Sequence, residues 1–145
     1  AIELTSGMLA RAQQQATNLH KLVDLRAGDV QQLDFRDATF DTVIATFVFC
    51  SVTNPVLGFQ EIIRVLKPSG VVLLLDHVRS EHPFWGKLMD MFNPLMLTLA
   101  GDNINRCTVE NVRRSGLAID EVIDLGRAGI FKMIVAHRPE VNSGD

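Results

Sequence analysis

Residues 42–48 read Thr42-Val43-Ile44-Ala45-Thr46-Phe47-Val48, a nearly continuous apolar run with several β-branched side chains. Such a run is typical of a strand in a parallel sheet that other elements cover on both faces. Val71 to Leu75 is a second run of this kind. The two runs together predict a buried, mostly parallel sheet.

A helix is expected between these two strands. Pro55 suits the first turn of a helix, Thr53 or Asn54 can cap it, and Lys67-Pro68-Ser69-Gly70 should end it. Its apolar residues recur on one face: Val56, Phe59, Ile62, Ile63 and Leu66.

The N-terminal part shows the same alternation. Ala1 to Leu4 is expected to form a short strand, and Ser6 to Leu19 carries apolar residues at helical spacing. Val23 to Ala27 alternates apolar and polar residues, as a half-buried strand does. Strands and helices that alternate through short links predict a doubly wound α/β sheet.

The C-terminal third differs in character. Residues 84–100 are rich in Met, Leu, Phe and Trp, and Pro94 should divide them into two helical pieces. A short helix is expected from Thr108, ending at Ser115-Gly116. Residues 117–125 and 130–136 then read as two strands, and their short connection predicts an antiparallel pair.

Composition and charge exclude several classes of protein. The chain has 145 residues, of which 47% are hydrophobic and 21% are charged, as expected for one globular domain. Its formal net charge of -3 makes a nucleic-acid partner unexpected. Because Ala1 to Ser6 does not read as a signal peptide and the longest apolar run is too short to span a bilayer, we expect a cytoplasmic location.

Four segments in fixed order resemble the class I, Rossmann-like methyltransferases that use S-adenosylmethionine. They are Ala1-Ile2-Glu3-Leu4, Ala27-Gly28-Asp29-Val30, residues 40–46 and residues 64–70. Within the ubiquinone/menaquinone-biosynthesis type, Phe49-Cys50-Ser51-Val52 and Asp76-His77-Val78 look similar to the thiol- and phospholipid-methyltransferase-like branch.

The resemblance implies that the first βα unit, with the glycine-rich loop of the family, would lie upstream of Ala1. We therefore expect a truncated methyltransferase domain at residues 1–138 and a polar tail at residues 139–145. Residues 84–107 are expected to form a lid or an acceptor-side insertion. The absent strand would lie between the strand of Glu3 and residues 42–48, so the sheet either closes up with other strand pairing or keeps a gap that a second chain can fill.

The resemblance also implies a site for S-adenosylmethionine at the carboxyl ends of the strands. Glu3, with Leu4 beside it, would bind the two ribose hydroxyls. Asp29 would accept a hydrogen bond from the adenine amino group, and the Val30 N–H would meet a ring nitrogen. From the residues alone, Glu3 could equally be a solvated terminal residue, and Asp29 could be a turn residue bonded to its own backbone.

Further residues are expected at the reactive end of the cofactor. Thr46 and Phe47 end their strand there and should line the pocket. His77 follows a central strand and is the candidate general base, with a structural role at the strand end as the alternative. Cys50 has no basic neighbour in the sequence and is expected to be a small pocket-wall residue. The histidines are scattered, so we expect no metal site.

The expected function is S-adenosylmethionine-dependent methyl transfer to a small, hydrophobic or lipid-like acceptor, with cofactor binding weakened by the absent glycine loop. The apolar residues 84–99 are also compatible with a peripheral membrane contact. The alternative is a non-catalytic remnant or interaction module that dimerises through its exposed sheet and apolar helices, so that a homodimer completes the sheet. A third alternative is a nicotinamide dehydrogenase, a class that also has an acidic residue at the position of Glu3. It agrees less well with the sequence, because the Gly28-Asp29 loop and the antiparallel closing pair resemble the methyltransferases. The acceptor atom stays open.

Overall fold

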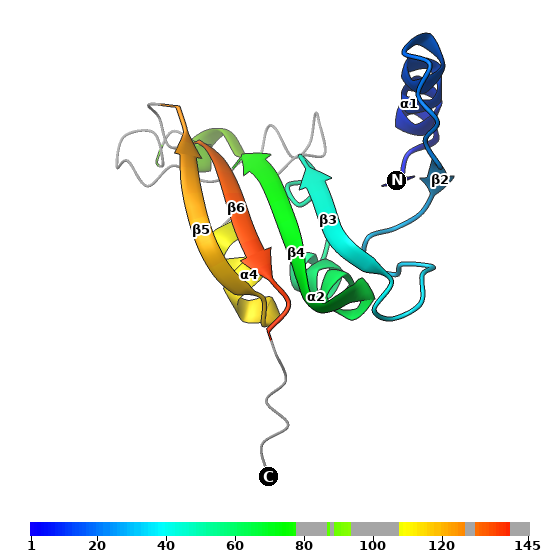
Figure 1. Cartoon of the computed structure of the whole chain (residues 1–145). Coiled ribbons are helices and arrows are strands. Elements are labelled where there is room, and N and C mark those ends of the chain that lie inside the picture. The colour runs from blue at the N-terminus through cyan, green and yellow to red at the C-terminus, as the bar shows by residue number, and fades with distance from the viewer. Residues whose placement is uncertain (78–86, 88, 94–107, 127–129, 140–145) are drawn as a thin grey trace.

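The computed structural model describes residues 1–77, 87, 89–93, 108–126 and 130–139. Four strands form the main sheet, in the order β3 (Phe40–Thr46), β4 (Leu66–His77), β6 (Phe131–His137) and β5 (Ala118–Leu125) (Figure 1). β3 and β4 are parallel, whereas β6 is antiparallel to both β4 and β5. The predicted α/β sheet with an antiparallel C-terminal pair is thus confirmed.

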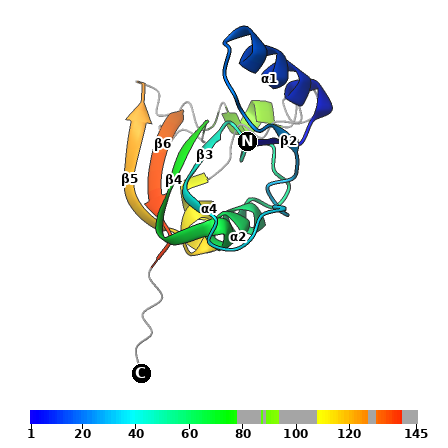
Figure 2. The same ribbon diagram turned by 45° about the vertical axis from the view of Figure 1, so that its right-hand side comes forward.

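A second, smaller sheet holds the N-terminal strands. β1 (Ile2–Glu3) and β2 (Arg26–Ala27) pair in parallel, and α1 (Ser6–Asn18) connects them. In the described part of the chain no strand pairing joins this sheet to β3, and α1 stands apart from the main sheet (Figure 2). The expected gap in the sheet therefore lies between β1 and β3. The predicted strand from Val23 to Ala27 is too long, because β1 offers partners only to Arg26 and Ala27.

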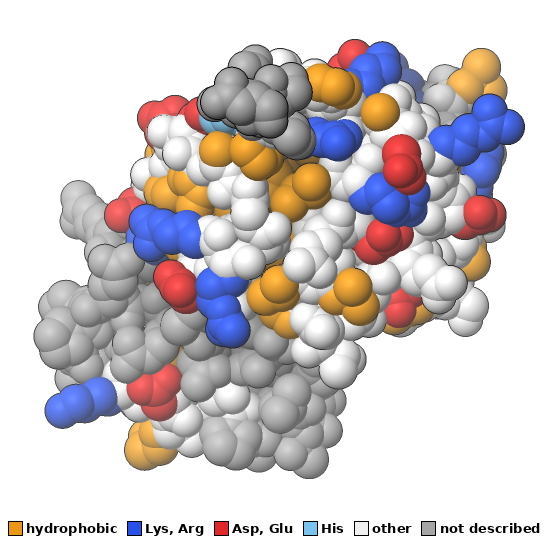
Figure 3. Space-filling view, turned by 90° about the horizontal axis from the view of Figure 1, so that it is seen from below, with side chains coloured by type: hydrophobic (Ala, Val, Ile, Leu, Met, Phe, Trp, Pro, Cys, Tyr) orange, Lys and Arg blue, Asp and Glu red, His pale blue; other side chains and the backbone are white. Residues whose placement is uncertain are grey.

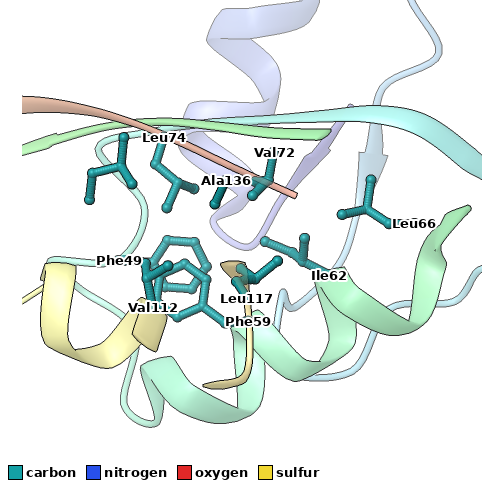
Figure 4. Close-up of a cluster of buried hydrophobic side chains, with 10 residues drawn as sticks. Phe49, Phe59, Ile62, Leu66, Val72, Leu74, Val112, Leu117 and Ala136 are labelled. Carbon is teal, nitrogen blue, oxygen red and sulfur yellow. The ribbon is translucent and has the colours of Figure 1, made fainter. Parts of the chain in front are cut away.

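Two helices cover one face of the main sheet. α2 (Pro55–Val65) and α4 (Thr108–Ser115) lie side by side beneath the strands (Figures 1 and 4). The rings of Phe49 and Phe59 stack between the sheet and these helices, with centroids 3.8 Å apart. Each fully buried side chain of this size contributes about 2 kcal/mol by leaving water. The buried cluster comprises Phe49, Phe59, Ile62, Leu66, Val72, Leu74, Val112, Leu117, Ile134 and Ala136.

The opposite face of β3 is exposed, which corrects the prediction of a strand covered on both sides. Val43 and Ala45 pack against the buried cluster, whereas Ile44 between them is 67% exposed. Side chains alternate between the two faces of a strand, and α2 and α4 both lie on the same face. β3 is also an edge strand of the four-stranded sheet.

The start of α2 confirms its predicted cap. The side chain of Asn54 accepts a hydrogen bond from the Leu57 N–H at 3.2 Å, and Pro55 occupies the first turn. The helix ends at Val65, so Leu66, which was expected in the helix, begins β4. Residues 67–70 form an irregularity in the β3–β4 register, in which Phe40 pairs with Leu66 but Thr42 pairs with Val71.

The predicted lid at residues 84–107 lies mostly outside the described residues, although residues 87 and 89–93 are helical. Most of the predicted polar tail, residues 140–145, also lies outside them. In the part of the chain that is described, no helix is long and apolar enough to cross a membrane.

Candidate cofactor and acceptor site

Glu3 and the turn after β2 meet at the carboxyl ends of two neighbouring parallel strands. Glu3 pairs with Ala27, and its carbonyl oxygen accepts a hydrogen bond from the Gly28 N–H at 3.2 Å. Its carboxylate Oε1 accepts from both the backbone N–H and the hydroxyl of Thr5, at 2.9 Å each. The Glu3 side chain is therefore held at the start of α1, whereas the neighbouring Leu4 is exposed.

Asp29 closes the turn that follows Gly28. Its Oδ1 accepts from the Gln31 N–H at 2.8 Å, as in the turn interpretation of this residue. The Gln31 Nε2 donates to the same carboxylate at 3.1 and 3.3 Å. A carboxylate has about four acceptor positions, so these bonds leave Asp29 able to accept from a further donor.

A small pocket adjoins this turn. Gly28 and Asp29 of the turn line this pocket. The apolar residues Ile2, Leu33 and Phe35 line it as well. Charged and polar side chains line the pocket as well, so it combines apolar contact with hydrogen-bonding groups, which suits a flat heterocycle that carries an amino group. Val30, the next residue, packs against the buried cluster, which fixes the backbone of the turn.

A second group of predicted residues gathers where β3 and β4 end. Thr46 pairs with Leu75, and the Phe47 N–H donates to the Leu75 carbonyl oxygen at 2.8 Å. Phe47 is 50% exposed and has a φ of 52°, the left-handed region that non-glycine residues seldom adopt. Its ring stacks on the His77 ring, with 6.5 Å between the ring centroids. It also forms a T-shaped contact with the Phe131 ring, with 6.2 Å between the centroids. Strained backbone of this kind, at a cost of about 1 kcal/mol, is often found at functional sites.

Cys50, Asp76 and His77 come together at the same end of the sheet. One potential metal-binding atom from each residue lies within 4.8 Å of the other two. Cys50 is 3% exposed and Asp76 is 2% exposed, so the cluster is largely buried. The Asp76 Oδ1 accepts from the His77 N–H at 3.0 Å, and the Cys50 thiol lies 3.4 Å from the Phe47 carbonyl oxygen.

The roles predicted for Cys50 and His77 from the sequence are separate and do not include this juxtaposition. A signal was available, because Cys50 follows β3 and Asp76-His77 ends β4, and the carboxyl ends of neighbouring parallel strands meet at one edge. Gln31 was also missed. Its Oε1 accepts from the Asn54 N–H at 2.8 Å, so it joins the Asp29 turn to the start of α2. A glutamine in a loop gives no sequence signal for such a bridge.

Arg64 and Glu61 on α2 hold the loop that connects β2 to β3. The Arg64 Nε and Nη2 donate to the two Glu61 carboxylate oxygens, each at 2.8 Å, and Arg64 also donates to the carbonyl oxygens of Leu33 and Phe35 at 2.8 Å. The hydrogen bonds from Arg64 lower the pKa of Glu61 below its ordinary 4.5. The ion pair thus fixes two of the apolar residues that line the pocket.

Charged side chains are mixed on the face of the molecule shown in Figure 3. There, Lys and Arg side chains are interspersed with Asp and Glu side chains, and apolar side chains lie between them. The described side chains in this view present no large patch of a single sign.

Comparison with known proteins identifies the family. Residues 1–74 match the family described as a methyltransferase domain. Phosphatidylethanolamine N-methyltransferase from Cereibacter sphaeroides is 37% identical over 78 residues, which cover 52% of this chain and 38% of that protein. The ubiquinone/menaquinone biosynthesis C-methyltransferase UbiE from Roseobacter denitrificans is 31% identical over 121 residues, which cover 78% of this chain and 48% of that protein.

A solved structure of a SAM-dependent methyltransferase from Methanosarcina mazei has the same fold. It superposes with a TM-score of 0.67 at 19% identity, and the match covers 94% of this chain and 80% of that one. The fold is thus the Rossmann-like methyltransferase fold, and the chain belongs to the methyltransferase domain family. It spans less than half the length of the two relatives named above.

S-adenosylmethionine is the cofactor of this family, and the described residues fit its adenosine half. Two carboxylates, Glu3 and Asp29, lie at the carboxyl ends of adjacent parallel strands, which suits the hydroxyls of a ribose and the amino group of an adenine. The pocket beside Asp29 has apolar side chains of the kind that an adenine ring contacts.

Proposed function

We propose that this chain forms the adenosine-binding and acceptor-facing parts of an S-adenosylmethionine-dependent methyltransferase. Its acceptor is a small, hydrophobic or lipid-like molecule. The observation that carries the proposal is the meeting of Glu3 with the Gly28-Asp29 turn at the carboxyl ends of β1 and β2. In an open α/β sheet, nucleotide ligands bind at this edge.

The residues at the ends of β1 and β2 have distinct roles in the proposal. Glu3 accepts hydrogen bonds from the two ribose hydroxyls, and the contact with Thr5 orients its carboxylate. Leu4, exposed beside it, provides apolar contact to the nucleoside. Asp29 accepts from the adenine amino group, and the Val30 N–H donates to a ring nitrogen.

Thr46, Phe47 and His77 form the acceptor end of the proposed site. S-adenosylmethionine, when bound, supplies an electrophilic methyl group on a sulfonium. The residues position the acceptor for in-line attack and keep water away, and this alignment provides much of the rate enhancement. Where the acceptor must lose a proton, the His77 imidazole takes it. The Phe47 ring, which stacks on His77, provides an apolar wall.

The relatives support the class of acceptor. One is named for phosphatidylethanolamine and another for ubiquinone and menaquinone biosynthesis, so both names indicate lipid-like molecules. One name specifies an N-methyltransferase and the other a C-methyltransferase, so the acceptor atom of this chain stays open. We assign residues 84–107 to the acceptor side of the domain, and we propose that the protein works in the cytoplasm or at a membrane surface. Exposed Met91 and Phe92 provide apolar surface in this segment.

The test is titration of S-adenosylhomocysteine into the chain, followed by calorimetry or ligand-observed NMR. We expect weak but saturable binding. Asp29→Asn should weaken it by about tenfold or more without unfolding the chain, because the Asn oxygen still accepts from the Gln31 N–H while its NH₂ group repels the adenine amino group. Glu3→Gln should also weaken binding, since the ribose site loses its charge.

The matched control is Asp41→Asn, at the opposite end of β3, where Asp41 pairs with Lys67 at 2.8 Å. This variant should bind like the parent chain. If the folded chain does not bind S-adenosylhomocysteine, or if Asp29→Asn and Asp41→Asn bind equally well, the proposal is wrong.

A second candidate function is that of a non-catalytic module that dimerises. It is favoured by the edge strand β3, whose Ile44 side chain is largely exposed. A homodimer that pairs its β3 edges would satisfy the unpaired backbone groups, and side chains of the partner strand would shield part of Ile44. Sedimentation at increasing concentration tests it. A dimer that Ile44→Lys dissociates, in a chain without affinity for S-adenosylhomocysteine, would favour this module over the enzyme.

A further inference from the structure

We propose that Cys50, Asp76 and His77 form a binding site for a zinc ion at the carboxyl ends of β3 and β4. A thiol sulfur, a carboxylate oxygen and an imidazole nitrogen already lie within 4.8 Å of one another. In tetrahedral zinc sites, bond lengths of about 2.0–2.3 Å place ligand atoms about 3.3–3.6 Å apart. The atoms therefore need to approach by about 1 Å, which small side-chain rotations provide.

The set of donor atoms favours zinc over the common alkaline-earth ions. Magnesium and calcium take oxygen ligands almost exclusively, whereas zinc accepts sulfur, nitrogen and oxygen together. Three protein ligands leave one position of a tetrahedron open. This is the arrangement of zinc sites that bind a water molecule or a ligand, rather than of closed structural sites.

Charge balance also suits a buried zinc ion at this place. Cys50 and Asp76 are almost completely buried, and charged groups are costly to bury unless they are compensated. A thiolate, a carboxylate and a neutral imidazole bring two negative charges, which the ion neutralises. The backbone N–H of His77 donates a 3.0 Å hydrogen bond to the Asp76 carboxylate. This bond would orient the carboxylate as a zinc ligand.

Zinc binding must compete with other interactions at the same residues. Cys50, Asp76 and His77 each take part in further interactions beyond those described above. Zinc binding must replace some of these interactions. The free energy that this replacement costs lowers the affinity of the site for the ion. A neutral imidazole has a single lone pair, so His77 cannot bind zinc and accept a proton from an acceptor in the same molecule.

The probes are Zn²⁺ in calorimetry and Co²⁺ in absorption spectroscopy, both without S-adenosylmethionine. Cys107 is first replaced by Ser, which leaves Cys50 as the single thiol of the chain. We expect one Co²⁺ per chain, with visible bands of tetrahedral cobalt and a near-ultraviolet band of cobalt–thiolate charge transfer. Cys50→Ser should abolish the thiolate band, and His77→Gln should weaken Zn²⁺ binding by about tenfold or more.

The matched control is His137→Gln, because His137 pairs with Val71 at the far end of the β4–β6 ladder from His77. This variant should bind zinc like the parent chain. Circular dichroism verifies that each variant is folded, and Cys50→Ser changes the volume of the buried side chain little. The inference is overturned if the folded chain binds neither ion at micromolar concentration, or if Cys50→Ser leaves the cobalt spectrum unchanged. Neither result would affect the test with S-adenosylhomocysteine.

Discussion

Gln31 donates hydrogen bonds to both carboxylate oxygens of Asp29, at 3.1 and 3.3 Å. The other end of the same side chain accepts from the Asn54 N–H at 2.8 Å. One side chain thus connects the turn after β2, where adenosine is proposed to bind, with the segment after β3 that leads into α2. The bridge therefore ties the proposed adenosine side of the site to the segment that follows the proposed acceptor end.

Gln31→Ala should destabilise the chain by about 1 kcal/mol, because it removes the partly buried hydrogen bonds to Asp29 and the exposed one from the Asn54 N–H. It should also weaken S-adenosylhomocysteine binding, since the Asp29 carboxylate is no longer oriented. Urea unfolding and calorimetry measure the two effects. The control is Gln32→Ala in the same loop, where the side chain is exposed and stability should change little. Equal stability of the two variants would show that the bridge does not form.

Arg64→Lys should lower the urea midpoint clearly more than Arg26→Lys. Arg64 makes a two-pronged contact with Glu61 and reaches three further acceptors in the 33–37 loop, and a lysine ammonium cannot reproduce this planar arrangement. The Arg26–Asp24 pair is far more exposed, at 56% and 68%, so solvent screens it. We expect the shift for Arg64→Lys to be at least about twice that for Arg26→Lys. Similar midpoints would contradict a structural role for the Arg64 contacts.

Stability should fall in acid partly through Glu61. The pKa of Glu61 is lower in the folded chain than its ordinary value of 4.5, chiefly because Arg64 donates hydrogen bonds to the carboxylate. A lowered pKa stabilises the fold above the unfolded value, and this contribution is lost as the pH falls through 4.5 towards the folded pKa. Urea unfolding between pH 7 and about pH 3 should therefore show a steeper loss of stability in the parent chain than in Glu61→Gln, with the difference arising below pH 4.5. Parallel curves would be the contrary result.

Gly70→Ala should destabilise the chain by about 1–3 kcal/mol. A Cβ at Gly70 would lie 2.9 Å from the Lys67 carbonyl oxygen and 3.3 Å from the Asp41 carbonyl oxygen, and backbone atoms cannot easily move aside. The control is Gly7→Ala in α1, where a Cβ would meet no atom within 4 Å. Its stability should stay the same or rise by less than about 1 kcal/mol, since alanine favours helix. Thermal unfolding of the two variants distinguishes a close backbone approach from a general effect of replacing glycine.

Local features of the fold could be predicted because their causes lie close together in the chain. The Asn54 cap involves an N–H only three residues away. The helix α2 could be predicted because its apolar residues recur at helical spacing on one face, which is a pattern within the helix itself. The antiparallel strands β5 and β6 follow from a short connection. The acidic residues Glu3 and Asp29 could be placed at strand ends because Glu3 ends β1 and Asp29 lies two residues after β2.

Features that depend on distant elements could not be predicted in the same way. Ile44 has the residue type of a buried strand, yet it is exposed because α2 and α4 both pack on the other face. The length of β2 depends on β1, which offers only two partners. The bridge through Gln31 spans 23 residues and needs the Asp29 turn to dock beside α2.

The sequence by itself determined the order and type of the described elements, the cap of α2 and the family to which the chain belongs. These depend on side-chain spacing and backbone preferences within a few residues. The tertiary structure alone decided which face of β3 is covered and which residues meet at the strand ends. Cys50 and His77 are 27 positions apart in the sequence numbering, and only the parallel pairing of β3 with β4 places both at one edge of the sheet. Such contacts follow from strand register, which is set by packing across the whole sheet rather than by neighbouring residues.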